Sequence, residues 1–174
     1  ITRRQFVRDT VTAAAAGLTA TCAVRAGNPD KADTAQIVNY NSDMEYRRCG
    51  RTGLMVSAVC LGGHWKRMDR IVPGVSFRGR ISAANLDDPD FAKNRREVVS
   101  RCIERGINYV DACTGPEIIA YTNALKGRRD KMYIGYSWYT REPYSKEHRT
   151  LKVIQAALDD GMKQAGLEYV DVWR

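Results

Sequence analysis

The chain has 174 residues, a formal net charge of +8 and an apolar fraction of 44%, which suits one globular domain or part of a larger one. The charge does not indicate nucleic-acid binding, because residues 1–26 hold four arginines and one aspartate and the other +5 is spread among mixed charges. A moderately basic surface would suit an anionic cofactor. The five cysteines form no Cys-x-x-Cys pair, and with only two histidines we expect no metal site. Cys60 and Cys102 are expected to be small buried thiols.

The first 26 residues have the features of an export signal. Residues 2–8 include Arg3 and Arg4 and resemble a twin-arginine signal, and residues 11–24 form an alanine-rich apolar stretch. That stretch is too short for a membrane span but has the length of a signal h-region. The alternative is an amphipathic or disordered N-terminus that carries two arginines by chance. We predict a signal over residues 1–26, export by the twin-arginine machinery to the periplasm or another extracytoplasmic space, and no stable membrane span after signal removal.

The polar residues 27–43 predict a linker, so the fold is expected over residues 44–174. It begins with a β-hairpin around Gly50 and Gly53, followed by a buried strand over residues 56–61 that Gly62 and Gly63 close. The next segment, residues 64–88, is long, basic and aperiodic. A loop of this length is usually functional or mobile, and the alternative is a solvated insertion.

Helices and strands then alternate to the end of the chain. Asp88 and Pro89 are typical of a helix start and Gly106 of a helix end. The pattern then predicts a strand over 107–111, a helix over 117–126, a strand over 132–137, a helix over 151–165 and a strand over 168–173. Such alternation requires parallel strands with right-handed crossovers. The prediction is therefore an α/β fold, either half of a (β/α)8 barrel or a small open sheet.

Asp111 is the first candidate site residue, because it ends a predicted strand and the C-terminal ends of strands carry the chemistry in parallel α/β barrels. Four ordered blocks of the chain then resemble the aldo-keto reductase family. They are MEYRRCGRTGLMVS (44–57), GINYVD (106–111), ALKGRRDK (124–131) and GLEYVD (166–171). The resemblance runs from residue 44 to residue 174. It implies the N-terminal half of a TIM barrel, with a hairpin closing its floor and about four β/α units, encoded within a gene for the full barrel.

The family's chemistry is NADP(H)-dependent reduction of small-molecule carbonyl substrates without a metal. Its site uses a Tyr as proton donor, a Lys held by an Asp that lowers the pKa of that Tyr, and a His that orients the substrate oxygen. Asp111 matches the Asp. Thr114 precedes the glycine where the Tyr would stand, and Ser137 stands in place of the Lys. The His position falls two residues beyond Arg174.

Further site residues follow from the same resemblance. Gly62, Gly63 and His64 match the family loop that passes near the nicotinamide, so they are the candidate cofactor-binding residues. Glycine there permits close backbone approach. The residues that could replace the Tyr in space are Tyr121, Tyr136, Tyr139 and Cys113, and their spacing selects none of them.

The sequence leaves three functions open. The first is an exported NADP(H)-dependent oxidoreductase of the aldo-keto reductase type with a non-standard site. The second is an exported, non-catalytic barrel of this type that binds a ligand or partner, which the residues Thr114 and Ser137 favour. The third is a stand-alone half-barrel module, which two open sheet edges disfavour.

Overall fold

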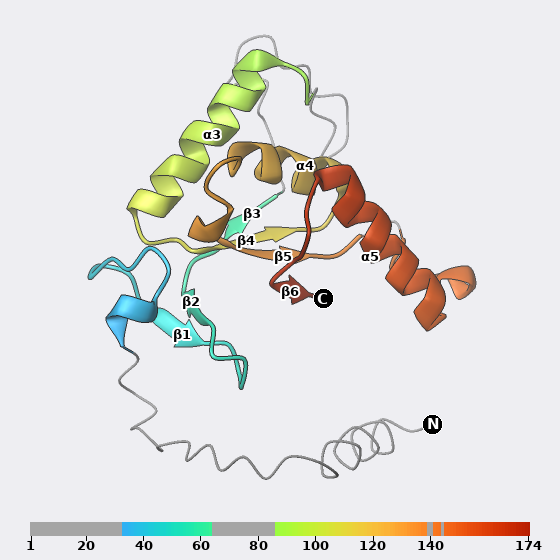
Figure 1. Ribbon diagram of the computed structural model, residues 1–174, viewed down its shortest axis with the longest axis horizontal. Coiled ribbons are helices and arrows are strands. Elements are labelled where there is room, and N and C mark those ends of the chain that lie inside the picture. Colours follow the sequence, from blue (N-terminus) through green and yellow to red (C-terminus); the bar gives the residue numbers. More distant parts are fainter. Residues whose placement is uncertain (1–32, 64–85, 139–140, 144) are drawn as a thin grey trace. The chain divides into compact units, whose positions relative to one another are not determined.

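The computed structural model describes residues 33–63, 86–138, 141–143 and 145–174 (Figure 1). The predicted signal over 1–26, residues 27–32 of the predicted linker, His64, the long segment after it up to residue 85, and Tyr139 therefore lie outside the described residues. The described elements follow the predicted alternation. They are η1 (Thr34–Gln36), β1 (Tyr46–Arg48), β2 (Met55–Ser57), β3 (Leu61–Gly62), α3 (Pro89–Glu104), β4 (Tyr109–Ala112), α4 (Gly115–Ala124), η2 (Arg129–Lys131), β5 (Tyr133–Tyr136), η4 (Lys146–His148), α5 (Leu151–Ala165) and β6 (Val172–Trp173).

Two sheets organise the domain. β1 and β2 form the predicted antiparallel hairpin, in which Tyr46 pairs with Ser57. The second sheet has four parallel strands in the order β3-β4-β5-β6, so each strand lies beside the next one along the chain. This order is the one that successive right-handed β/α units produce. The predicted class is confirmed: the hairpin and the parallel β/α units are those of a partial (β/α) barrel.

The helices begin and end where local chemistry requires. Asp88 caps α3 by accepting hydrogen bonds from the backbone N–H groups of Asp90 and Phe91. Thr114 caps α4 in the same way, which starts that helix at Gly115 rather than at Glu117. The left-handed backbone of Gly166 ends α5 as predicted.

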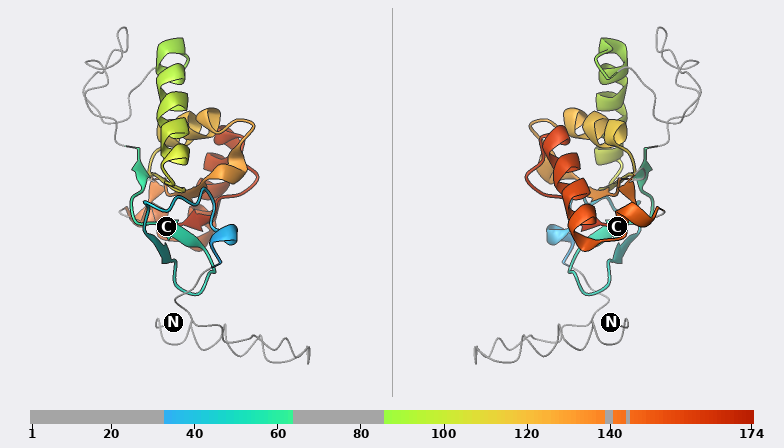
Figure 2. Two further views of the ribbon diagram at one scale, coloured as in Figure 1. Left: turned by 90° about the vertical axis from the view of Figure 1, so that its left-hand side faces the viewer. Right: turned by 90° about the vertical axis from the view of Figure 1, so that its right-hand side faces the viewer.

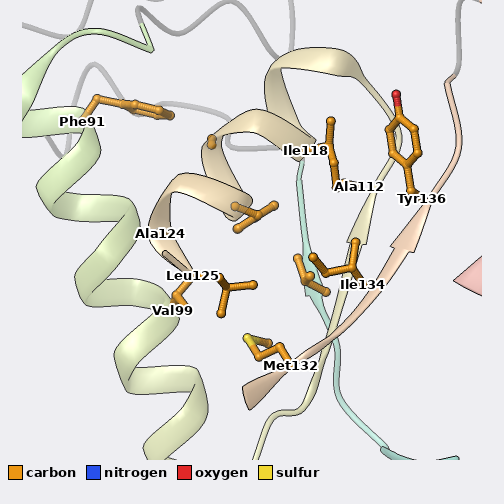
Figure 3. Close-up of a cluster of buried hydrophobic side chains, with 12 residues drawn as sticks. Phe91, Val99, Ala112, Ile118, Ala124, Leu125, Met132, Ile134 and Tyr136 are labelled. Atoms are coloured by element: carbon orange, nitrogen blue, oxygen red, sulfur yellow. The ribbon is translucent and has the colours of Figure 1, made fainter. Parts of the chain in front are cut away.

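The hydrophobic core lies between the helices and one face of the parallel sheet (Figure 3). α3 contributes Phe91 and Val99, and α4 contributes residues that include Ile118 and Leu125. From the sheet, Ala112, Ile134 and Tyr136 point toward the helices (Figure 3). Because side chains alternate along a strand, Tyr109 and Asp111 of β4 and Gly135 of β5 belong to the opposite face. We call this second face the inner face of the sheet.

The predicted strand over residues 56–61 is wrong in one respect, because the structure divides it between the two sheets. Met55–Ser57 belongs to the hairpin and Leu61–Gly62 to the parallel sheet. Ser57 causes the break: its backbone N–H donates to the Asn108 side chain at 2.8 Å, and its hydroxyl donates to the Val59 carbonyl at 2.7 Å. The chain therefore turns at residues 58–60, and Cys60 is exposed rather than buried. Cys102 is partly buried against the core, which raises its pKa.

The described part of the predicted linker is tied to the domain. Ile37 is buried, and the Val38 carbonyl accepts a hydrogen bond from the Asn108 side chain at 3.0 Å. The Tyr46 hydroxyl donates to the carbonyls of Asn39 and Gly106, both at 3.0 Å. The structured part of the chain therefore includes residues 33–43 and does not start only near Met44. The polar composition of this segment, which suggested a linker, instead supplies hydrogen bonds to the base of the sheet.

Candidate functional site

The candidate site lies where β4, β5 and β6 end, on the inner face of the sheet. Asp111 on β4 is level with Gly62 on β3 and with Gly135 on β5, and Gly135 is level with Val172 on β6. The ladder continues one step further, because the backbone N–H of Ser137 donates to the Ala112 carbonyl and that of Arg174 to the Tyr136 carbonyl. The structure therefore places Asp111 at the C-terminal edge of the sheet, as predicted.

Asp111 forms an ion pair with Arg174. The Arg174 Nε donates to Asp111 Oδ1 at 2.7 Å, and both side chains are partly exposed. Burial of Arg174 opposes its charge, but the hydrogen bond and the negative charge of Asp111 outweigh burial and raise its pKa. The guanidinium is therefore permanently charged. Because only the Nε–H is used on Asp111, the terminal Nη groups can donate to a further acceptor.

The Asp111–Arg174 pair joins two strands that are not adjacent. β5 separates β4 from β6, so Arg174 reaches across about 9–10 Å of sheet, twice the spacing of adjacent strands. The β5 residue level with Asp111 is Gly135, and Ser137 is the next inner-face position. Gly135 has no side chain of its own on this face, and the space next to it is occupied by Tyr109.

Tyr109 supplies a phenol on the same face. A Cβ built on Gly135 would lie 1.9 Å from the Tyr109 hydroxyl, so this phenol occupies the volume that the glycine leaves open. Burial raises the pKa of Tyr109, and the charge of Asp111 raises it further, against a smaller lowering by Arg174. Tyr109 therefore remains protonated at neutral pH.

Cys113 and Glu117 stabilise the end of β4. The Cys113 backbone N–H donates to Glu117 Oε2 at 2.7 Å, and the Glu117 side chain is fully buried. A Cβ on Gly63 would lie 2.3 Å from Glu117 Cδ, so Gly63 is needed to accommodate this carboxylate. Burial, followed by the hydrogen bond and the charge of Glu117, raises the pKa of Cys113 to about 12. Cys113 is therefore a thiol, not a thiolate nucleophile.

The other candidate phenols have structural positions. The Tyr121 hydroxyl donates to the Gly62 carbonyl, and burial raises the pKa of Tyr121 to about 12. The Tyr136 hydroxyl lies against Gly161 of α5 on the helix side of the sheet, and burial raises its pKa as well. Neither phenol lies on the inner face with Asp111. Ser137, where the family has its Lys, is buried, and its hydroxyl has no hydrogen-bond partner among the described residues.

Gly62 and Gly63, the two candidate cofactor-binding glycines, have different surroundings. Gly63 makes room for Glu117, whereas a Cβ on Gly62 would meet nothing within 4 Å. Gly62 lies beside Asp111 on the inner face, and its open side permits close approach of a flat ring to the backbone. This open side is the feature of the described residues that a nicotinamide ring could use. No phosphate-binding element is identified among them.

Sequence reasoning missed Arg174, Tyr109 and Glu117. Tyr109 could have been found, because it precedes Asp111 by two residues in a strand and so shares its face. Arg174 could not, since its pairing with a carboxylate 63 residues away depends on strand order. No cluster of three or more potential metal ligands occurs in the part of the chain that the structure describes. Among those same residues, no helix is both long and apolar enough to cross a membrane.

Comparison with known proteins supports the fold. No protein-family model matches the sequence. Two solved structures of a presumed aldo-keto reductase from Pseudomonas aeruginosa are similar, with TM-scores of 0.50 and 0.51 and sequence identities of 16% and 17%. Each alignment covers 82% of this chain and 49% or 50% of the other. The chain thus spans about half the length of these structures, and it has the barrel fold of the aldo-keto reductase type.

Proposed function

We propose that this chain is part of an oxidoreductase of the aldo-keto reductase type that uses NADP(H) on a carbonyl or alcohol substrate. The observation that carries the proposal is the Asp111–Arg174 ion pair on the inner face, at the C-terminal ends of parallel strands in this fold. Paired charges at such strand ends are typical of active sites. The likeness of fold and the sequence resemblance at residues 106–111 support the same assignment.

The chemistry assigned to this site differs from the family pattern in its cation. Arg174 takes the place of the Lys as the partner of Asp111, and it reaches Asp111 from a different strand. When bound, NADPH supplies the hydride. Arg174 donates a hydrogen bond from an Nη group to the substrate oxygen and stabilises the negative charge that develops there. Its guanidinium does not release a proton at neutral pH. The proton comes from Tyr109, the inner-face phenol that lies over Gly135 and whose pKa burial and the charge of Asp111 raise.

The test is a pair of measurements on the full-length protein. NADPH binding is followed by quenching of its fluorescence, and turnover of a simple aldehyde by loss of NADPH absorbance. Arg174→Ala is expected to lower kcat/KM by about 100-fold, as for removal of one preorganised donor. Asp160→Asn is the matched control, because it breaks the exposed Arg141–Asp160 pair elsewhere in the domain. Absence of NADPH binding would overturn the proposal.

A second function is favoured by Ser137 and Thr114. With neither the Lys nor the Tyr of the family pattern, the barrel would bind a ligand or partner without turning it over. Thr114 supports this alternative because its side chain caps α4. Ligand binding without turnover, and without any effect of Tyr109→Phe, would identify the non-catalytic barrel.

We also propose that the protein is exported by the twin-arginine machinery to an extracytoplasmic space. The support is the Arg3–Arg4 pair followed by the apolar residues 11–24. The two arginines would be replaced by lysines in a fusion of residues 1–43 to a folded reporter. Export of the parent fusion and its loss in the variant is the expected result. Equal export of both fusions would contradict the proposal.

A further inference from the structure

A cavity that is not part of the candidate site lies between α3 and α4. Its volume is about 210 Å³, and its walls combine apolar and basic side chains. The apolar part includes Leu86, Phe91 and Ala120, and the basic part consists of Lys93, Arg95 and Arg96. None of its lining residues in the described part of the chain is a carboxylate. Pockets for drug-sized ligands are usually about 300–1,000 Å³, so this cavity suits a ligand of about one ring.

Arg95 is the unusual residue of this cavity. It lies in the buried stripe of α3 between Phe91 and Val99, where an apolar side chain would be expected, and it is only 8% exposed. Its guanidinium donates to the Asn94 side chain at 2.6 Å and lies 5.9 Å from the Phe91 ring centre. A buried charge is costly unless interactions offset the cost, and here Asn94, Phe91 and Tyr121, whose pKa burial raises and Arg95 lowers, supply such interactions. Because Arg95 lines the cavity, its charge acts inside it.

Arg128, which lies beside α3, adds to the positive electrostatic potential near the cavity. Arg128 donates hydrogen bonds to the Arg96 carbonyl and to the Ser100 hydroxyl, so it lies beside the same helix. Burial lowers the pKa of Arg128, and the charge of Arg96 lowers it further. The carboxylates of α3 nearest in sequence, Asp90 and Glu97, do not line the cavity. Glu97 lines a neighbouring groove with Arg101 and Glu104, and the side chains of Lys93 and Arg96 border that groove as well as the cavity.

We propose that the cavity between α3 and α4 binds a small amphiphilic carboxylate, with its apolar body against Phe91 and its carboxylate toward Lys93, Arg95 and Arg96. Charge complementarity selects an anion, since three cations and no carboxylate are among the described residues that line the cavity. The apolar wall selects a ligand with a hydrophobic body over a bare inorganic anion. The site is independent of the Asp111–Arg174 pair and of the proposed oxidoreductase function.

Calorimetric titration of the full-length protein tests the site with three probes. Benzoate has the charge and the apolar body, benzyl alcohol has the body without the charge, and inorganic phosphate has the charge without the body. Benzoate is expected to bind at least about ten-fold more tightly than either of the others, because a charge-assisted hydrogen bond adds to burial of the ring. Its affinity is expected to fall as ionic strength rises.

Variants identify where benzoate binds. Arg96→Ala and Lys93→Ala are each expected to weaken binding by about ten-fold. Both side chains belong to exposed residues, so the fold should persist, and thermal unfolding checks this. Arg101→Ala is the matched control: it removes an arginine of the same helix that pairs with Glu104 and does not line the cavity. Equal affinity of all three variants, or equal binding of benzoate and benzyl alcohol, would overturn the proposal.

Discussion

Two aspartate–arginine ion pairs lie near opposite ends of the same sheet. They differ in the number of further contacts that their side chains make and in their exposure to solvent. Near the start of β5 and β6, Arg129 donates to Asp171 Oδ2 at 2.7 Å, and this oxygen also accepts the Ile134 backbone N–H at 2.7 Å. Arg129 also donates to the Met132 carbonyl and stacks on the Tyr169 ring at 4.4 Å. These contacts tie the entry of β5 to the entry of β6.

At the C-terminal ends, the Asp111–Arg174 pair has the same 2.7 Å separation but fewer partners. Within the described residues, one hydrogen bond joins the two side chains and no other reaches the Asp111 carboxylate. Its exposed fractions, 44% for Arg174 and 33% for Asp111, exceed the 24% and 15% of Arg129 and Asp171. The Arg129–Asp171 pair has more partners, although the Arg129 Nε has none among the described residues. A pair with several further contacts stabilises the fold, whereas an exposed pair with unused donors and acceptors can bind a ligand. The following variants test this difference.

Breaking the Arg129–Asp171 pair is expected to have the largest effect on stability. Asp171→Ala leaves the Arg129 charge and the Ile134 N–H without their shared acceptor in a partly buried place. Loss of one partner of a buried pair costs about 3–5 kcal/mol, and partial exposure of this pair puts the expected loss at about 3 kcal/mol. Urea unfolding measures it. A loss below about 1 kcal/mol would show that the two pairs do not differ in the way described.

Gly135→Ala is expected to have the second-largest effect on stability. The new Cβ would lie 1.9 Å from the Tyr109 hydroxyl, so the phenol or the strand must move. Overpacking of this kind costs about 1–3 kcal/mol. Adding Tyr109→Phe removes the hydroxyl and should recover part of the loss. A double-mutant cycle by urea unfolding checks this, and strict additivity would show that the two residues do not contact.

Arg174→Ala is expected to change stability by less than about 1 kcal/mol, because partly exposed ion pairs contribute little. The same variant is the one for which we expect the large loss of turnover. Measuring the stability loss and the loss of turnover on this one variant therefore shows whether the Asp111–Arg174 ion pair serves the active site or the stability of the fold. A stability loss equal to that of Asp171→Ala would assign Arg174 to the fold.

The prediction with the smallest expected effect concerns the reactivity of the cysteine thiols. The pKa of Cys113 is about 12, raised first by burial and then by Glu117, so this thiol stays protonated and should react slowly with iodoacetamide at pH 8. Cys60 is exposed and should react before Cys113. Mass spectrometry of timed samples gives the order, and equal rates would contradict the placement of Cys113.

The raised pKa of Cys113 also gives a dependence of stability on pH. Its contribution is fully present below the ordinary thiol pKa of about 9 and is lost as pH rises toward the folded value of about 12. Cys113→Ser should reduce the slope of stability against pH in this window. An unchanged slope would assign the alkaline loss to other groups, such as Tyr121.

The sequence by itself determined the order of elements in the described residues. Helix boundaries such as Asp88–Pro89 and Gly166 use local capping chemistry, so a short stretch of sequence contains the whole signal. The alternation of helices and strands likewise fixed a parallel sheet, because a parallel connection needs a crossover. The position of Asp111 at a strand end followed from the same local pattern.

Only the tertiary structure decided what surrounds Asp111. The partner Arg174 comes from two strands away, and no local pattern reports which strands end side by side. The break after Ser57 and the docking of residues 33–43 both depend on Asn108, which is far from them in sequence. Hydrogen bonds across such separations are set by packing of the whole domain, so residue order alone does not specify them.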